Sequence, residues 1–235
     1  MNDSLNRWNL KGKKCLVTGG SKGIGKAIVE EFLVLGAEVF LVSRSPEDLS
    51  NLILDWQQKG YTVSGLALDV SEPESRVMLA ERIGSEFGKL DVLINNVGTN
   101  IRKKTIDYSE DEYLKILSTN LTSAYHLCQL MFPLLTNSGQ GNIVNISSVG
   151  GLTHLRTGSV YGMTKAALIQ LTKNLAVEWA DQNIRVNAVA PWYIGTPLAE
   201  SVLKDPEYLN QVLARTPMKR IGSPQEVAAA AAFFC

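Results

Sequence analysis

The feature that most constrains the fold of this chain is a regular alternation of short apolar runs with longer segments of helical pattern. The apolar runs are rich in Val, Ile and Leu and cover residues 14–18, 38–43, 61–69, 90–95, 141–147 and 185–190. Several are apolar almost throughout, which is typical of strands covered on both faces. Six strands alternating with helices predict right-handed βαβ units, and therefore an α/β protein with a doubly wound parallel sheet and helices on both of its faces.

Helix starts are marked between the predicted strands. Ser45 stands before Pro46, a residue that suits the first helical position. Three further serines each precede a Glu by three residues, which is the capping-box spacing. These serines are Ser71, Ser109 and Ser223.

No linker, internal repeat or low-complexity tract divides the 235 residues, so we predict a single dinucleotide-binding and catalytic domain over residues 1–235. A proline-bracketed helical segment at about residues 195–217 breaks the alternation after the sixth strand. Ligands of such sheets lie beyond the carboxyl ends of the strands, so this segment is placed to form a small helical lid. An ordinary pair of surface helices is the alternative.

Composition excludes several classes of function. The 23 Lys and Arg balance the 23 Asp and Glu, so no overall field favours nucleic acid or an anionic membrane. Three distant cysteines and two histidines, His126 and His154, lack the spacing of a disulfide framework or a metal site. No secretory leader or membrane-spanning run is recognisable in the sequence. We expect a soluble cytoplasmic protein without a metal.

The first predicted strand runs into a glycine-rich turn that opens a helical segment. Glycine lets the backbone approach a ligand closely, and the free N–H groups of a first helical turn favour a phosphate. The G-x-x-x-G-x-G spacing predicts a cradle for a nucleotide pyrophosphate, with a tight structural turn as the alternative. The cradle residues are Gly19, Ser21, Lys22, Gly23, Ile24 and Gly25.

The second predicted strand ends at Ser43 and Arg44. An enzyme selective for NAD carries an acid near this point, which accepts from the ribose 2′-hydroxyl. Arg44 instead offers a planar fork of donors to a 2′-phosphate, and Lys22 lies in the neighbouring turn. We therefore predict NADP(H) as the cofactor. The alternative is that both are solvated surface cations.

A reacting group is indicated after the fifth predicted strand. Ser148 follows that strand, and Tyr161 and Lys165 lie four residues apart in the next helical segment. Two such side chains share one face of a helix, so the ammonium is expected to lower the pKa of the phenol from about 10 toward neutrality. The phenol would then be a usable acid or base, with Ser148 binding the same substrate oxygen. Taken alone, such a pair is common on helix surfaces.

Together with Asn95-Asn96-Val97-Gly98 and Asn120, these motifs have the order and spacing of the short-chain dehydrogenase/reductase family, which the chain resembles from about residue 10 onward. Residues 95–103, 125–130 and 183–198 are most similar to tropinone reductase-like members. The resemblance implies a Rossmann fold and the activity of an NADP-dependent carbonyl reductase. In the reverse direction such an enzyme oxidises the CH–OH group of an alcohol. In relatives a further strand follows the last helical run, and we expect it to be missing here because the sequence is incomplete.

The resemblance also implies a role for each of four side chains. Tyr161 protonates the carbonyl oxygen as hydride arrives from the nicotinamide, and Lys165 lowers the pKa of Tyr161 and holds the nicotinamide ribose. Ser148 hydrogen-bonds the substrate oxygen. Asn120 positions a water that connects the lysine to solvent.

Contacts with the dinucleotide follow from the same resemblance. Asp69 and Val70 contact the adenine, whereas Asn96 and Gly98 lie along the adenosine ribose. The segment that follows the sixth strand holds the nicotinamide carboxamide. Its contact residues are Pro191, Trp192, Ile194 and Thr196, and Trp192 stands where the family often has glycine.

Candidate residues of the substrate pocket are mostly apolar or aromatic, which favours a compact lipophilic ketone. They are Asn100, Arg102, Ser148, Gly150, His154, Leu155, Tyr161, Trp192, Tyr193 and Leu198. In tropinone reductases the position of Arg102 faces the substrate. The guanidinium is therefore expected to repel cationic tropinone and to make it a poor substrate. An Arg102 turned outward into water is the alternative.

Two other functions share parts of this pattern. A reductase of 3-oxoacyl thioesters carries the same motifs, and a non-catalytic NADP(H)-binding sensor or scaffold would keep the fold without turnover. The four reacting side chains argue against the second, because the fold does not require them.

The expected partners are a small ketone or alcohol and further copies of the chain. Helices 109–135 and 158–181 are apolar on more than one face, which predicts a homotetramer or dimer.

Overall fold

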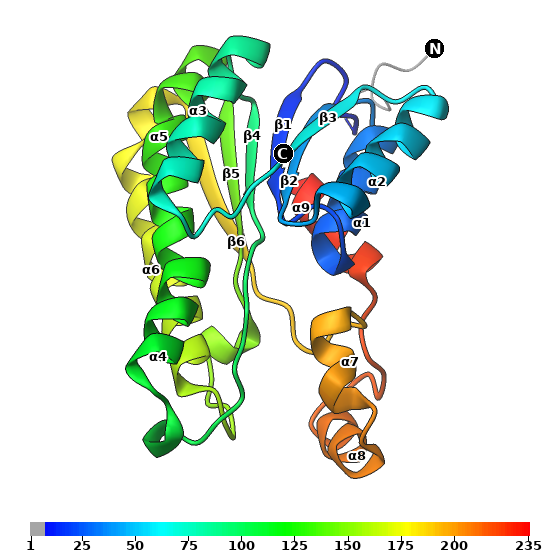
Figure 1. The fold of residues 1–235 in the computed structure, drawn as a ribbon, viewed down its shortest axis with the longest axis vertical. Helices are drawn as coiled ribbons and strands as arrows, with labels where there is room; N and C mark the ends of the chain where they lie inside the picture. Colours follow the sequence, from blue (N-terminus) through cyan, green and yellow to red (C-terminus); the bar gives the residue numbers. More distant parts are fainter. Residues whose placement is uncertain (1–7) are drawn as a thin grey trace.

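The structure is a computed structural model that describes residues 8–235, so the first seven residues of the predicted domain lie outside it. A parallel sheet of six strands lies at its centre, in the order β3-β2-β1-β4-β5-β6 (Figure 1). The strands are β1 (Lys14–Thr18), β2 (Glu38–Ser43), β3 (Val63–Ala67), β4 (Val92–Asn95), β5 (Gly141–Ile146) and β6 (Ile184–Val189). The predicted doubly wound α/β fold is confirmed, and every predicted strand is present. The third, fourth and fifth strands are shorter than predicted, and the sixth is shifted by one residue.

Helices cover both faces of this sheet (Figure 1). On one side lie α1 (Gly23–Val34), α2 (Pro46–Gln58) and α9 (Pro224–Phe233), and on the other α3 (Pro73–Phe87), α4 (Glu110–Leu117), α5 (Ser123–Ser138) and α6 (Ser159–Glu178). Each face has its own cluster of buried apolar side chains, with Phe32 in one cluster and Phe40 in the other. The strands are therefore apolar throughout because both of their faces are packed.

Three of the four predicted helix starts have the expected caps. In these three the serine hydroxyl accepts from the backbone N–H three residues on; the serines are Ser45, Ser109 and Ser223. The prediction at Ser71 is wrong. Its hydroxyl donates to the Asp69 carboxylate at 2.7 Å and is turned away from the helix, so α3 begins one residue later with Glu72 as its N-cap.

The long helix predicted over residues 109–135 is interrupted in the middle. A π-helical turn, η3 (Ser118–Thr122), joins α4 to α5. Such turns are rare and occur frequently at functional sites. This one carries Asn120, which is buried with 1% of its surface exposed. Pro133 does not end the helix, because α5 continues to Ser138.

The predicted helical segment after β6 is present, and its role as a lid stays a prediction. There α7 (Pro197–Leu203) and α8 (Pro206–Ala214) stand beyond the carboxyl ends of the strands, before α9 returns to pack against α1 (Figure 1). A short parallel bridge between Ile194 and Gly222 closes the base of this insertion. Across residues 8–235, no helix combines the length and the apolar character that crossing a membrane requires.

Asp91 fixes the amino-terminal end of β4. It is 1% exposed, and its carboxylate accepts from the Lys14 amide at 2.8 Å, from Ser138 at 2.6 Å and from Lys89 at 3.2 Å. Burial alone raises the pKa of this carboxyl. The hydrogen bonds from Ser138, Lys14 and Lys89 together outweigh burial and hold the pKa below its ordinary value of 3.8.

A carboxyl whose pKa is lowered by folding stabilises the protein above its ordinary pKa, and this contribution is lost as the pH falls through the folded-state value. We expect Asp91→Asn to lower the free energy of unfolding by about 1–3 kcal/mol near neutral pH, because buried donors lose a charged acceptor. The difference from wild type should shrink below pH 3.8. Urea denaturation across this range measures it, with Asp55→Asn at an exposed ion pair as the control. A difference that persists in acid would contradict the assignment.

Candidate active site

Two adjoining hollows open at the carboxyl ends of the strands. The dinucleotide groove, as we call the first, is lined by residues that follow β1, β2, β3 and β4. The substrate cavity, the second, continues from it beneath α7 and α8. The strand order reverses between β1 and β4, and ligands of open α/β sheets bind at such a crevice. Residues shared by both hollows are Ile24, Ser147, Tyr161, Thr196 and Leu198.

The glycine turn between β1 and α1 leaves no room for side chains. Gly19 and Gly23 have positive φ angles of 69° and 54°. A Cβ on Gly25 would lie 2.1 Å from the Gly19 carbonyl oxygen and 2.5 Å from Nδ2 of Asn96. The backbone and the amino terminus of α1 are thereby open to the groove, as the binding of a pyrophosphate requires. The residues present therefore fit a dinucleotide.

Most of the predicted cofactor residues line the dinucleotide groove. They are Gly19, Ser21, Lys22, Gly23, Ile24, Ser43, Arg44, Asp69, Val70, Asn96, Gly98, Tyr161, Lys165 and Thr196. Gly25 lies behind the turn, and the remaining three, Pro191, Trp192 and Ile194, line the substrate cavity. The sequence reasoning missed three polar residues of this groove, which are Thr99 in the loop after β4, Lys115 on α4 and Thr119 in η3.

Of the two cations predicted for the 2′-phosphate, Arg44 follows β2 and Lys22 lies in the glycine turn before α1. Arg44 has 77% of its side chain exposed and lies 3.8 Å from the Asp69 carboxylate. Lys22 is 65% exposed and lies 2.7 Å from Asp48 in the first turn of α2. Exposed pairs of this kind contribute little to stability. Both cations can therefore leave these acids for a phosphate.

Tyr161 and Lys165 lie one turn apart on α6 and both face the groove. Lys165 is 4% exposed, and its Nζ donates to the carbonyl oxygen of Ile146 at 2.7 Å. Burial lowers the pKa of this ammonium to about 8. Nζ lies 5.8 Å from the centroid of the Tyr161 ring.

The expected lowering of the Tyr161 pKa is wrong for this structure. Burial raises the pKa of the phenol above its ordinary value, and the Ser148 hydrogen bond and the charge of Arg102 lower it only in part. Lys165 is not among the groups that lower the pKa of Tyr161, and its Nζ donates to the Ile146 carbonyl at the end of β5. The phenol therefore stays protonated at neutral pH, which suits a proton donor.

The side chain of Asn120 forms hydrogen bonds with the segments that surround Tyr161 and Lys165. Its Nδ2 donates to the Thr99 carbonyl at 2.9 Å and to the Thr164 hydroxyl at 3.1 Å. Its Oδ1 accepts from the Thr99 amide at 2.7 Å. The π-turn thus ties the loop after β4 to α6 beside Lys165. A role for Asn120 in holding a water stays a prediction.

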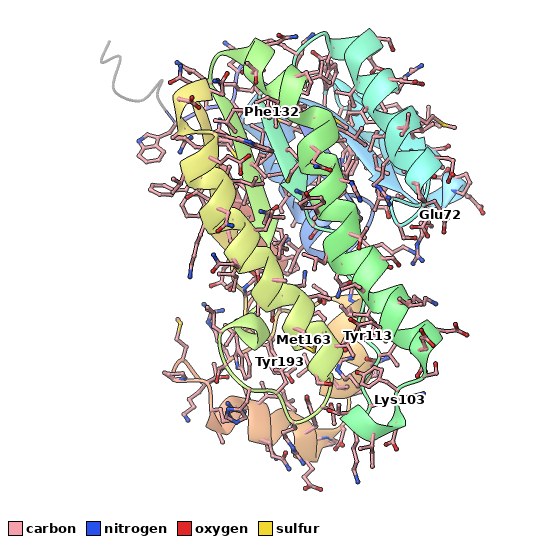
Figure 2. All side chains as sticks on the ribbon, turned by 90° about the vertical axis from the view of Figure 1, so that its left-hand side faces the viewer. Glu72, Lys103, Tyr113, Phe132, Met163 and Tyr193 are labelled. Carbon is pink, nitrogen blue, oxygen red and sulfur yellow. The ribbon has the colours of Figure 1, made fainter. Side chains whose placement is uncertain are left out.

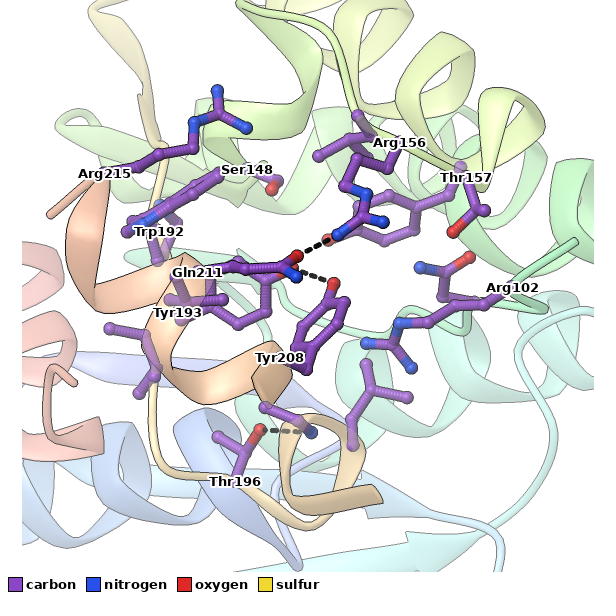
Figure 3. A pocket seen from close by; sticks show the side chains of 18 of the residues that line it. Arg102, Ser148, Arg156, Thr157, Trp192, Tyr193, Thr196, Tyr208, Gln211 and Arg215 are labelled. Atoms are coloured by element: carbon purple, nitrogen blue, oxygen red, sulfur yellow. Dashed lines mark hydrogen bonds between the residues drawn. The ribbon is translucent and has the colours of Figure 1, made fainter. Parts of the chain in front are cut away.

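The substrate cavity has a volume of about 170 Å³ (Figure 3). Eight of the ten predicted pocket residues line it: Asn100, Arg102, Ser148, Leu155, Tyr161, Trp192, Tyr193 and Leu198. Gly150 and His154 do not. Gly150 is buried behind Leu155, whose Cδ1 would lie 2.8 Å from an added Cβ, and His154 is exposed. Among the described residues, no group of three or more His, Cys, Asp or Glu is placed to hold a metal ion.

Several lining residues were missed by the sequence reasoning: Arg156, Thr157, Tyr208, Gln211 and Arg215. The last three belong to α8 and its end, whose helical pattern was visible although the face turned to the cavity was not. Tyr208 and Tyr193 share a hydrogen bond of 2.5 Å, and Arg156 donates to Gln211 (Figure 3). These contacts connect α8 to the segments that carry the reacting groups.

The close packing of the glycine turn generates a prediction. We expect Gly25→Ala to abolish detectable NADPH binding and to lower the unfolding temperature, because the added methyl overlaps the Gly19 carbonyl. Gly84→Ala on α3 is the matched control, since nothing lies within 4 Å of its added Cβ. Calorimetric titration with NADPH and thermal unfolding measure the two effects. Binding by Gly25→Ala as tight as by wild type would refute the cradle.

Comparisons with known proteins show the family to which this chain is similar. The family model described as enoyl-(acyl carrier protein) reductase matches residues 19–235. A tropinone reductase homolog of Arabidopsis thaliana is 54% identical over 230 residues, which cover 97% of this chain and 87% of the relative.

Two solved structures are similar throughout. One is gluconate 5-dehydrogenase from Burkholderia cenocepacia in complex with NADP and tartrate. It has a TM-score of 0.94 at 28% identity, and the match covers 99% of this chain and 91% of the dehydrogenase chain. L-Sorbose reductase from Gluconobacter frateurii, complexed with NADPH and L-sorbose, has a TM-score of 0.91 at 33% identity, with coverages of 97% and 91%. By its sequence, its fold and the side chains gathered at the carboxyl ends of its strands, this chain belongs to the short-chain dehydrogenase/reductase family of oxidoreductases.

Proposed function

We propose that this protein is an NADPH-dependent reductase that converts a compact, largely apolar ketone into a secondary alcohol by hydride transfer. The observation that carries the proposal is the place of Tyr161, which lines both the dinucleotide groove and the substrate cavity. A proton donor at that junction can reach a carbonyl oxygen while the carbonyl carbon faces the cofactor. NADPH, when bound, supplies the hydride.

The residues of the chain would supply the proton and the orientation. Tyr161 donates its phenolic proton to the carbonyl oxygen, and its raised pKa keeps that proton in place at neutral pH. Ser148 hydrogen-bonds the same oxygen from the cavity wall. Lys165, buried in the groove with a pKa of about 8, is placed to hold the nicotinamide ribose. Asn120 positions both elements by tying the loop after β4 to α6.

The choice of NADP(H) over NAD(H) rests on the end of β2. Arg44 and Lys22 both line the groove there and are exposed enough to meet a 2′-phosphate. No acid occupies the last position of β2, where Ser43 stands. Two similar solved structures contain NADP or NADPH, which supports the same cofactor here.

A reductase of 3-oxoacyl thioesters is the second candidate, favoured by the description of the family model. A cavity of about 170 Å³ accommodates a compact ketone more readily than a long acyl chain. A sensor that binds NADP(H) without turnover would not need the phenol at the junction of the two hollows.

We also propose an assembly and a compartment, which the surface and the cysteines support. α5 and α6 lie on the face shown in Figure 2, where Met163 is labelled, and their exposed apolar side chains include Tyr125, Met163 and Val177. Such a face supports a homotetramer or dimer.

Cys15, Cys128 and Cys235 are all free thiols, which supports a reducing compartment such as the cytoplasm.

The central test is removal of one oxygen. We expect Tyr161→Phe to lower kcat/KM for ketones by about 10²–10⁴-fold, because the proton donor is lost, and to leave NADPH binding intact. Absorbance at 340 nm follows turnover, and calorimetry follows NADPH binding. Tyr61→Phe, at the opposite end of the sheet, is the matched control and should behave as wild type. Undiminished turnover by Tyr161→Phe would refute the mechanism.

The cofactor assignment has its own test. We expect Arg44→Asp to shift the ratio of kcat/KM for NADPH over NADH by about 10- to 100-fold toward NADH, because a charge-assisted hydrogen bond to the 2′-phosphate is replaced by repulsion. Arg82→Gln, at an exposed ion pair on α3, is the control. An unchanged ratio in Arg44→Asp would show that the 2′-phosphate lies elsewhere.

A further inference from the structure

The substrate cavity has an uneven charge that the sequence reasoning did not anticipate. Three guanidinium groups line it, those of Arg102, Arg156 and Arg215 (Figure 3). No Asp, Glu or Lys is among the described residues of its lining. A partly enclosed pocket with three fixed positive charges and no negative one favours an anion inside it and disfavours a cation.

Two of these three guanidinium groups are already engaged. Arg156 donates to Gln211 on α8, and Gln211 in turn donates to the exposed Glu207 at 3.1 Å. Arg215 lies over the Trp192 ring, with its guanidinium carbon 5.5 Å from the ring centroid. Both arginines are exposed, so they add to the positive electrostatic potential at the mouth of the cavity. Their guanidinium groups are already engaged by these contacts and are not available to bind a ligand.

Arg102 differs from the other two arginines. It is partly buried, and it takes part in none of the hydrogen bonds, ion pairs or ring contacts described for residues 8–235. Its charge reaches Tyr161 and Tyr193: burial raises the pKa of both phenols, and the charge of Arg102 opposes that rise in part. A partly buried guanidinium with no acid beside it is a costly arrangement unless a ligand completes it.

Asn100 adds a second donor beside Arg102. It lines the same cavity, and its Oδ1 is buried without a hydrogen-bond partner. An added Cβ on Gly158 would lie 3.1 Å from this oxygen and 3.5 Å from Nδ2, so both ends of the amide lie near that backbone. Within residues 8–235 Nδ2 donates in no described hydrogen bond, and it is not among the fully buried unpaired atoms, so it is available to a ligand. A guanidinium and an amide N–H that line one cavity can together meet the two oxygens of a carboxylate.

We propose that the ketone reduced by this protein carries an anionic group, a carboxylate, and that Arg102 with Asn100 binds it while the carbonyl oxygen lies at Tyr161. This inference rests on the proposed reductase function and specifies its substrate class as compact oxo acids with an apolar body. Trp192, Leu155 and Leu198 pack on that body. Arg102 is thus the residue that determines specificity, and the order of preference runs from anionic through neutral to cationic ketones.

A matched set of ketones tests the inference. The set comprises 4-oxocyclohexanecarboxylate, its neutral methyl ester and cationic tropinone, each reduced with saturating NADPH. We expect wild-type kcat/KM to be about 10- to 100-fold higher for the carboxylate than for the ester, and lowest for tropinone. In Arg102→Gln, kcat/KM for the carboxylate should fall by about that factor, whereas kcat/KM for the ester should change little. Arg102→Lys should restore part of the lost kcat/KM, because the positive charge returns without the planar guanidinium that binds both carboxylate oxygens. Arg82→Gln should keep the wild-type order.

A binding measurement separates this inference from the reductase proposal. Cyclohexanecarboxylate cannot be reduced, and calorimetry should show it to bind wild type more tightly than Arg102→Gln by a similar factor. If the ester is reduced as fast as the carboxylate, or if Arg102→Gln keeps the preference, the anion site is refuted while the reductase stands. If no ketone is reduced, the proposed function fails, and the titration with cyclohexanecarboxylate alone decides whether Arg102 binds a carboxylate.

Discussion

The parallel direction of the six strands is the constraint on which the rest of this structure depends. It brings every carboxyl end to one edge of the sheet, and the reversal of strand order between β1 and β4 opens a crevice at that edge. The glycine turn, the end of β2, the loop after β4 and the segment after β6 then meet around one ligand site. Residues separated by more than a hundred positions in the sequence become neighbours because their strands end together.

Burial decides the chemistry within this crevice. Lys165 is withdrawn from water, and this burial lowers the pKa of its ammonium to about 8, while Nζ donates to the carbonyl oxygen of Ile146. The phenol of Tyr161 is desolvated as well, so its pKa rises rather than falls. The pair is therefore arranged with a protonated donor at the substrate and a buried cation at the cofactor. Helical spacing alone would have placed the ammonium against the phenol.

The lid adds a selective element to a common framework. α8 contacts the cavity wall through the Tyr193–Tyr208 and Arg156–Gln211 hydrogen bonds, and none of its carboxylates lines the cavity. Arg102 consequently keeps its charge unpaired in a partly enclosed space. Relatives that share the dinucleotide groove can differ in substrate through such side chains, because the groove and the cavity are built by different segments.

The sequence by itself determined the strands, three of the four tested helix caps, the glycine turn and the family, because each depends on residues that are neighbours in the chain. Tertiary structure decided which partner each polar group finds. Ser71 turns to Asp69 instead of capping α3, the π-turn breaks a helix of continuous pattern at Asn120, and Lys165 donates to Ile146. The face of α8 that meets the cavity was likewise settled only by packing. A local pattern specifies backbone geometry, whereas hydrogen bonds, burial and pKa depend on distant segments that only the folded sheet brings into contact.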